Sequence, residues 1–329
     1  MTNKEKYDIF CDLNYVPIYS KPWWLDVVCG PENWDVWLYY NDKTDNVNGI
    51  EAAMPYYVEK RGSHLYITKA PLSQNNGIIF KQFHKRKIVS QAKYQEKVIN
   101  AACAFISSLQ IDVYEQQFHY SFQNWQPYFW NNYTCTTRYT YVIQDTLDMA
   151  KVIDNFSANC RNSIRKGQFI TQISRDISPD TFYSEHEKVF LRQNRSCPFS
   201  RETWYCLYKA CIEHDAGQMF CAKDTAGNIH ALLFLVWDEA SVYHLLGGYM
   251  PEFSSSQAYS ALTYHGICVA HEKGLPYDFE GSMIRQIAVA FRQFGGIPMP
   301  YYRIRKVFNP EIVRQEAESY IQQLQKSNL

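Results

Sequence analysis

Apolar and polar positions recur along the chain with the two periods of helices and strands. Apolar residues at helical spacing through residues 87–109 predict a long helix with one buried face. Side chains alternate in residues 111–118, which predicts a strand directly after that helix. The second half repeats this pair, with a helix over residues 254–273 and a strand over 276–280. Further strands are expected at 36–40, 49–59, 64–69, 136–143, 219–223, 229–238, 241–248 and 299–306.

The two halves show the same order of predicted elements. Each has a two-stranded hairpin, a loop, a helix, a strand, a short segment and a last strand. The strand after the helix reads IDVYEQQF in the first half and PYDFEGS in the second. Such a repeat predicts two copies of one α+β fold. We therefore expect a first domain over residues 1–145 and a second domain, with a terminal helix, over 146–329.

Composition limits the partners and the compartment. The formal net charge of zero gives no basic stripe for DNA or for non-specific nucleic-acid binding. The ten cysteines form no CxxC pair, which is typical of free thiols in a reducing compartment. The chain shows no secretory signal and no apolar run of membrane-spanning length. These patterns predict a cytoplasmic protein without a membrane span, and they leave the oligomeric state open.

Common catalytic motifs are absent from the sequence. It contains no GxGxxG, P-loop lysine, HExxH or GxSxG motif and no zinc-ligand spacing. Dehydrogenase, kinase, metalloprotease and standard hydrolase functions are therefore not favoured. We expect no metal site and no permanently bound cofactor.

Two acidic residues of the strand at 276–280 are the first candidate site. Asp278 and Glu280 are two residues apart, so a regular strand would place both carboxylates on one face. Charged pairs are rarely buried without partners. They are candidates for accepting a proton, and the open alternative is a structural network of salt bridges with Arg303 or Arg305.

The loop before the predicted helix at Ser254 is a candidate for binding an anion. Gly247 and Gly248 end a predicted strand, and Ser254, Ser255 and Ser256 open the next predicted helix. A helix N-terminus presents unpaired N–H donors and a partial positive charge, which suit a phosphate or a carboxylate. The alternative is an ordinary serine cap.

Arginines on the helix at 157–167 are a further candidate for recognising an anion. Arg161 and Arg165 are one helical turn apart and share a face. Guanidinium groups bind phosphate and carboxylate in bidentate geometry. The alternative is a solvated basic face. Asn194 and Arg195 follow another predicted helix, where the choice is between a cleft and a helix C-cap.

Several motifs together resemble a known family. The segments YDFEGSM, FRQFGG and PYYRIRK, the helix SANCRNSIRKG and the opening KPWWLDVV are similar to the GNAT-fold acyltransferases related to the Fem (methicillin-resistance factor) aminoacyltransferases. The resemblance extends from about Pro17 to Lys306. It implies two tandem GNAT-like domains, each a mixed, mostly antiparallel sheet flanked by helices. It also implies transfer of an acyl or aminoacyl group from a carrier to an amine.

The sequence departs from the family in two places. GGYMPEFSSS stands where ordinary GNAT enzymes carry the Q/RxxGxG/A pyrophosphate motif. The long paired-helix arm of several tRNA-using Fem enzymes is also missing. Acyl-CoA is the expected co-substrate, and tRNA is not favoured. The alternatives are an aminoacyl-tRNA-dependent ligase of the peptidoglycan type and a non-catalytic binding module.

These observations combine into one hypothesis, an N-acyltransferase acting on an amine of a small molecule or of a cell-envelope or polysaccharide precursor. Asp278 or Glu280 would accept the amine proton, and the Gly247–Gly248 backbone would polarise the carbonyl. Tyr301 is the third catalytic candidate. The expected substrate contacts are Arg161, Asn194, Arg195, Ser282 and Arg303, and the expected donor contacts are Gly247, Gly248, Ser254, Ser255 and Ser256.

Overall fold

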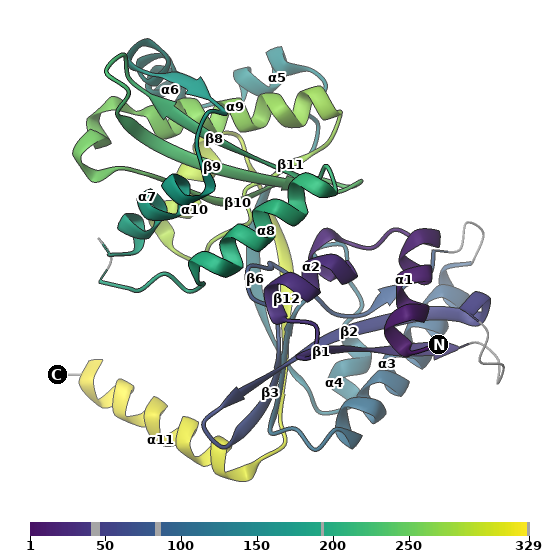
Figure 1. Ribbon diagram of the computed structural model, residues 1–329. Coiled ribbons are helices and arrows are strands. Elements are labelled where there is room, and N and C mark those ends of the chain that lie inside the picture. The colour runs from purple at the N-terminus through teal and green to yellow at the C-terminus, as the bar shows by residue number, and fades with distance from the viewer. Residues whose placement is uncertain (41–46, 83–86, 192–193, 328–329) are drawn as a thin grey trace. The chain divides into compact units, whose positions relative to one another are not determined.

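The computed structural model describes residues 1–40, 47–82, 87–191 and 194–327, with side chains described up to residue 323. The chain forms two compact units (Figure 1). Unit 1 comprises Met1–Thr137 and Tyr301–Leu329, and unit 2 comprises Arg138–Pro300. None of the helices in the described part has the length and hydropathy that a membrane crossing requires.

Unit 1 is a mixed sheet with helices. Its strands are β1 (Trp34–Tyr40), β2 (Ile50–Arg61), β3 (His64–Thr68), β4 (Ile79–Phe80), β5 (Val113–Gln117) and the second part of β12 (Ile297–Val307). The order is β1-β2-β3-β5-β12, with β4 paired to β2. β3 and β5 run parallel, and the other pairs described in this unit are antiparallel. Its helices are α1 (Asn3–Leu13), α2 (Pro22–Cys29), α3 (Ile88–Ser108), α4 (Gln126–Trp130) and α11 (Pro310–Ser327).

Helix α3 fills the core of unit 1 with the face that its sequence predicts. Val98, Ile99, Ala102 and Ile106 are all buried in one cluster with side chains of the sheet. Ile88, at the first turn, is 89% exposed, so the predicted apolar face is wrong there. The first turn of α3 fits the spacing of the predicted apolar face but does not contribute to the core.

Unit 2 has the same kind of sheet. Its strands are the second part of β6 (Thr134–Ile143), β7 (Gln172–Ser174), β8 (Gly217–Lys223), β9 (Ile229–Trp237), β10 (Val242–Tyr249), β11 (Tyr277–Asp278) and the first part of β12. The order is β6-β11-β10-β9-β8-β7. β10 and β11 run parallel, and the other described pairs in this order are antiparallel. Its helices are α5 (Met149–Asp154), α6 (Ala158–Ile170), α7 (Pro179–Leu191), α8 (Arg201–Glu213), α9 (Ala258–Lys273) and α10 (Arg285–Gln293).

The predicted repeat is present in the order of the elements, but the last strands are exchanged. The series β3-α3-β5-α4-β6 is followed by β10-α9-β11-α10-β12. The strand that ends the first series, β6, pairs with β11 through Ile143 and Tyr277. The strand that ends the second series, β12, pairs with β5 through Ile304 and Gln116. The units consequently divide at 137/138 and 300/301, whereas the sequence pattern placed one boundary at 145/146.

Helices α6 and α9 approach closely because of a glycine. A Cβ atom on Gly167 would lie 2.5 Å from the carbonyl oxygen of Gln257, which precedes α9. The predicted cap of α6 is confirmed, since the Ser157 hydroxyl accepts a hydrogen bond from the backbone of Cys160 at 3.1 Å. The close approach of Gly167 to Gln257 fixes the start of α9 against α6.

Candidate active site

Two neighbouring strands of unit 2 separate part-way along their length. β10 and β11 pair in parallel over two residue pairs, the second of which joins Tyr243 to Asp278. β10 then continues along β9, with a register shift after His244. The chain after β11 stays with β6, where Phe279 donates its backbone N–H to Tyr141 at 2.9 Å. The candidate site is the region where these two strands part.

Asp278 lies at this point and is fully buried, at 0% exposure. Its Oδ1 accepts hydrogen bonds from the Thr140 hydroxyl and, at 2.7 Å, from the backbone N–H of Glu280. Its Oδ2 has no hydrogen-bond partner in the described part of the chain. Burial raises the pKa of Asp278 to about 6, and the two hydrogen bonds oppose that shift. Asp278 has no exposed surface here and holds the N–H of Glu280 at the start of the following turn, and its predicted catalytic role stays a prediction.

Glu280 occupies that turn in a left-handed backbone conformation, with φ of 62°. It is partly buried, and burial raises the pKa of its carboxyl well above the ordinary value. Such a conformation is uncommon for a residue other than glycine and often marks a functional position. Next to it, Gly281 also has positive φ, and a Cβ there would collide with the carbonyl oxygen of Tyr139.

The predicted shared face of the two carboxylates is wrong. The strand ends at Asp278, so the alternation of a strand does not extend to Glu280. Tyr277 and Phe279, expected on the opposite face, are buried together with Asp278. The local reason is the turn at Glu280 and Gly281, whose left-handed backbone stops the strand.

The arginines considered as partners of these acids form other ion pairs. The Nη2 atom of Arg303 lies 2.5 Å from Glu115, and the Nε atom of Arg305 lies 3.1 Å from the same carboxylate. Arg305 also pairs with Glu316 at 2.5 Å. Tyr301 donates its hydroxyl to the side chain of Gln117 at 3.0 Å. Tyr301 and Arg303 are part of unit 1, whereas Asp278 and Glu280 are part of unit 2.

The two glycines of β10 are required by packing. A Cβ on Gly247 would lie 2.6 Å from Nε2 of His244 and 2.8 Å from the hydroxyl of Tyr259. A Cβ on Gly248 would lie 2.8 Å from Val189 of α7. This close packing explains both glycines without a ligand, and their predicted role in donor binding stays a prediction.

A buried polar group that the sequence analysis missed lies beside these glycines. Nδ1 of His244 is 2.7 Å from the hydroxyl of Tyr277, and its Nε2 is 2.9 Å from the hydroxyl of Tyr259. Burial lowers the pKa of His244 to about 3, so the ring is neutral and has one donor and one acceptor nitrogen. The available signal was a histidine within the apolar strand sequence VYHLLGG. His244 links β10 to β11 and to α9 at the point where the two strands separate.

The predicted helix start at Ser254 is wrong. Residues Pro251–Ser256 form a short 3-10 helix, and α9 begins at Ala258. Gln257 interrupts them with a left-handed backbone, φ 60°. The hydroxyl of Ser256 accepts from the N–H of Ala258 at 3.2 Å and donates to the carbonyl of Phe253 at 2.7 Å, while the N-cap position of α9 is Gln257, which makes no side-chain cap. Ser254 and Ser255 are exposed.

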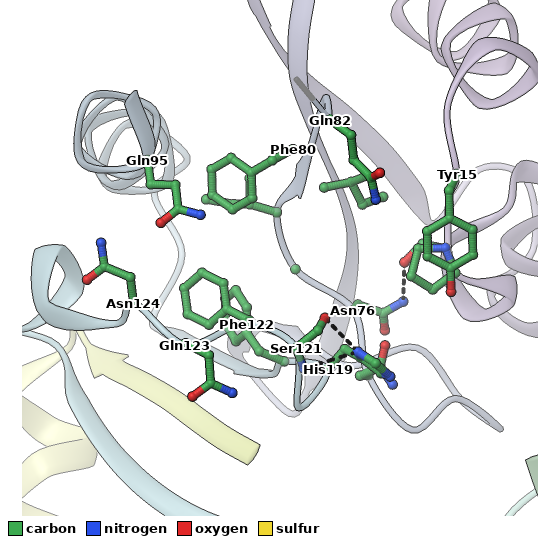
Figure 2. Close-up of a pocket in the computed structure, with 17 residues that line it drawn as sticks. Tyr15, Asn76, Phe80, Gln82, Gln95, His119, Ser121, Phe122, Gln123 and Asn124 are labelled. Carbon is green, nitrogen blue, oxygen red and sulfur yellow. Dashed lines mark hydrogen bonds between the residues drawn. The ribbon is translucent and has the colours of Figure 1, made fainter. Parts of the chain in front are cut away.

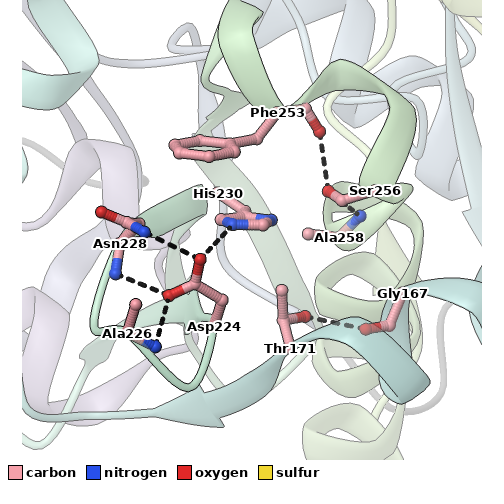
Figure 3. Close-up of polar contacts among 9 residues, drawn as sticks. All are labelled: Gly167, Thr171, Asp224, Ala226, Asn228, His230, Phe253, Ser256 and Ala258. Atoms are coloured by element: carbon pink, nitrogen blue, oxygen red, sulfur yellow. Dashed lines mark hydrogen bonds and ion pairs between the residues drawn. The ribbon is translucent and has the colours of Figure 1, made fainter.

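The segment before α9 is anchored on the hairpin between β8 and β9 (Figure 3). The Phe253 ring stacks on His230, with centroids 3.9 Å apart and an interplanar angle of 5°. His230 lies 3.2 Å from the carboxylate of Asp224, which also accepts from the side chain of Asn228 at 2.8 Å. The Asn228 side chain, with other donors, lowers the pKa of Asp224 to about 2. The loop that follows β10 is thereby held in place.

Arg161 of α6 donates a hydrogen bond to the backbone and also lines a surface cavity. Its guanidinium donates to the carbonyl of Phe156 at 2.5 Å, which is a structural role at the end of α5. Arg161 and Arg165 also line a cavity of about 180 Å³ together with apolar side chains and Tyr264. Arg165 is 3.1 Å from the side chain of Asn162. The arrangement leaves both the anion-binding interpretation and the basic-face alternative open.

The other predicted substrate contacts lie in turns. Asn194 has a left-handed backbone, φ 53°, and donates its N–H to Leu191 at 2.9 Å, which fits a helix end. Arg195 is exposed beside it. The Ser282 hydroxyl accepts from the N–H of Ile284 at 3.0 Å directly before α10. Of the three, Ser282 is on the same turn as Glu280.

A family model matches the part of the chain that contains this geometry. Residues 155–282, which include β10, α9, β11 and the Glu280 turn, match the GNAT acetyltransferase domain. No match to the chain was found among curated protein sequences.

Solved structures share the fold of the whole chain. A FemX structure matches with a TM-score of 0.68 and 11% identity, covering 96% of this chain and 98% of that one. L-PGS from Bacillus licheniformis matches with a TM-score of 0.51, 13% identity and coverage of 91% and 90%. A tandem GNAT protein from the clavulanic acid biosynthesis pathway matches with a TM-score of 0.50, 10% identity and coverage of 93% and 94%. The chain therefore contains a GNAT acetyltransferase domain and shares the fold of these solved structures, which include a tandem GNAT protein.

Proposed function

We propose that the protein is an N-acyltransferase that moves an acyl group from acyl-CoA to a primary amine. The observation that supports this most is that the matched GNAT domain contains the separation of β10 from β11. An extended carrier with amide groups can add to a strand edge by backbone hydrogen bonds. The edge of β10 beyond Tyr243, where β11 leaves it, suits such a carrier.

The reaction requires a group that removes a proton from the amine. The nitrogen attacks the thioester carbonyl, a C–N bond forms, the C–S bond breaks, and the thiolate leaves with a proton from the medium. Glu280 is the better candidate for the base, because its side chain is partly exposed, whereas Asp278 has no exposed surface. Asp278 holds the N–H of Glu280 and acts as a positioning residue.

The remaining contacts of the proposal come from the residues around the strand separation. Backbone N–H groups near Gly247 and Gly248 would polarise the thioester carbonyl. Ser282, on the turn with Glu280, would contact the acceptor. The acceptor would be an amine of a small molecule or of a cell-envelope precursor, and the fold shared with FemX is what supports this choice.

Aminoacyl-tRNA is the second candidate donor. The fold shared with FemX and L-PGS favours it, because the resemblance to the Fem enzymes implies an aminoacyl group as the one transferred. This candidate predicts RNA binding that weakens steeply with salt. Filter binding at two salt concentrations tests it, and acyl-CoA binding without RNA binding would eliminate it.

Ligand binding and turnover test the proposal. Acetyl-CoA and longer acyl-CoAs should raise the melting temperature, whereas a ligand that does not bind the native state should leave it unchanged. Glu280→Gln should abolish transfer to an amine panel, while Glu202→Gln, at an exposed position of α8, serves as the matched control. A folded Glu280→Gln protein with full transfer activity would refute the assigned base, and acyl-CoA binding without any turnover by the wild type would favour a non-catalytic binding module.

A further inference from the structure

Unit 1 contains a cavity of its own, with a volume of about 390 Å³ (Figure 2). Residues 15–20, the loop 75–82 and the loop 118–124 contribute to its wall together with Gln95 of α3. This volume is within the range of small-molecule sites, roughly 300–1,000 Å³. A Cβ on Gly77, which has φ of 126°, would lie 2.6 Å from the Phe118 ring, so the loop can follow this path only with glycine.

Aromatic rings form one part of the wall. The Phe80 and Phe122 rings are nearly parallel, with an interplanar angle of 6° and centroids 6.4 Å apart. Phe118 supports Phe122 from a centroid distance of 4.5 Å. Phe80 and Phe122 are partly buried, so ring surface faces the cavity. Flat apolar faces of this kind take the C–H face of a ring-shaped ligand.

Amide side chains form the other part, and several have no partner. Within the described residues, no hydrogen bond engages the side chains of Asn75, Gln82, Gln95 or Asn124. Asn75 is 5% exposed and lines the cavity. Buried polar groups are normally hydrogen-bonded, and a ligand would supply the missing partner. Figure 2 shows the amides of Gln95 and Asn124 beside the two rings.

His119 adds a donor to the same wall. Its Nδ1 accepts from the backbone N–H of Ser121 at 3.2 Å, so the proton of the neutral ring is on Nε2. Burial lowers the pKa of His119 to about 4, which keeps the ring neutral at pH 7. The Nε2 atom is buried and has no hydrogen-bond partner among the described residues.

The described lining of this cavity carries no charged side chain. Phosphate and carboxylate ligands are usually held by arginine or lysine, so this lining does not suit an anion. Amides both donate and accept hydrogen bonds, as hydroxyl groups do. We propose that the cavity binds an uncharged monosaccharide unit, with its C–H face on Phe122 and its hydroxyls on the amides and His119. This site is independent of the transfer reaction proposed for unit 2.

Titration calorimetry on the full chain tests the proposal with glucose, galactose and N-acetylglucosamine as probes. At least one sugar should bind, and Phe122→Leu should weaken its Kd about tenfold or more because the flat ring is lost. Phe129→Leu is the matched control, since Phe129 is 61% exposed on α4 and is not part of the lining. A second variant, Gln95→Met, should weaken binding about fivefold while the melting temperature stays that of the wild type.

Three outcomes would overturn the inference. The first is no binding of any sugar at its highest soluble concentration, or binding that Phe122→Leu leaves unchanged. The second is binding of glucose 6-phosphate or glucuronic acid at least tenfold tighter than glucose, which would show an anion site. The third is Phe122-dependent binding of uridine or adenosine without binding of the sugars. Each is distinguishable from failure of the acyl-transfer proposal, whose assay uses acyl-CoA and Glu280→Gln.

Discussion

Replacing Asp278 with asparagine should change the stability of the protein in a pH-dependent manner. Asparagine keeps the Oδ1 acceptor for Thr140 and for the N–H of Glu280. It removes the carboxyl whose charged form is disfavoured by complete burial and by the nearby charge of Asp238. The second oxygen, which has no described partner, becomes an amide N–H₂ group. Burying this amide group without a partner lowers the free energy of unfolding by about 1–3 kcal/mol, and this loss does not vary with pH.

The magnitude follows from the pKa of Asp278. The folded-state value of about 6 lies above the ordinary value of 3.8, so unfolding releases a proton between these pH values. The contribution of Asp278 to the free energy of unfolding is therefore largest below pH 3.8. It is lost as the pH rises towards 6. A shift from 3.8 to about 6 corresponds to about 3 kcal/mol. Asp278→Asn should gain about that much relative to wild type between about pH 4 and pH 7.

Urea unfolding at several pH values, followed by tryptophan fluorescence, measures this difference. The chain has eight tryptophans, so the transition is visible without a label. Asp12→Asn, at an exposed position of α1, is the control and should show no comparable trend. A difference between Asp278→Asn and wild type that stays constant from about pH 4 to pH 7 would refute the claim that a buried, chargeable carboxyl occupies this position.

Three further substitutions test other local features. Gly281→Ala should lower the free energy of unfolding by about 2–4 kcal/mol, because positive φ and a backbone collision both oppose a Cβ; an unchanged urea midpoint would contradict this. Ser256→Ala removes the acceptor for the N–H of Ala258 and the donor to the carbonyl of Phe253 and should lower the free energy of unfolding by about 1–3 kcal/mol; an unchanged thermal or urea transition would contradict this. Arg303→Gln removes a partly exposed pair with Glu115 and should change stability by about 1 kcal/mol or less; a loss several times larger in the same assay would show that the pair is more than a surface contact.

The sequence predicted those parts of the fold that local periodicity determines. The buried face of α3 follows from spacing, since Val98, Ala102 and Ile106 recur at one side of the helix. The order of elements in each half follows from the same patterns. The exchange of β6 and β12 does not, because strand pairing between residues more than a hundred positions apart leaves no mark on local spacing. The predicted boundary at 145/146 lies a few residues inside unit 2, and the return of the chain to unit 1 at Tyr301 has no local signal in the sequence.

The candidate site shows a similar division. The sequence pattern extended the strand to residue 280, whereas it ends at Asp278 and the left-handed backbone of Glu280 and Gly281 follows. That Glu280 also adopts this backbone could not be read from its residue type, and it removed Glu280 from the face of Asp278. His244 was overlooked because its partners, Tyr259 and Tyr277, are distant in sequence and come together through the fold alone.

The pairing of β12 with β5 has a consequence for how the protein is made. Residues 138–300 are contiguous, so unit 2 has all of its strands as soon as that stretch has left the ribosome. The amino-terminal unit lacks the neighbour of β5 until the segment from Tyr301 is translated. Nascent chains that stop before this segment would thus leave the first-synthesised unit unfinished, and that unit rather than the later one would depend on chaperones during translation.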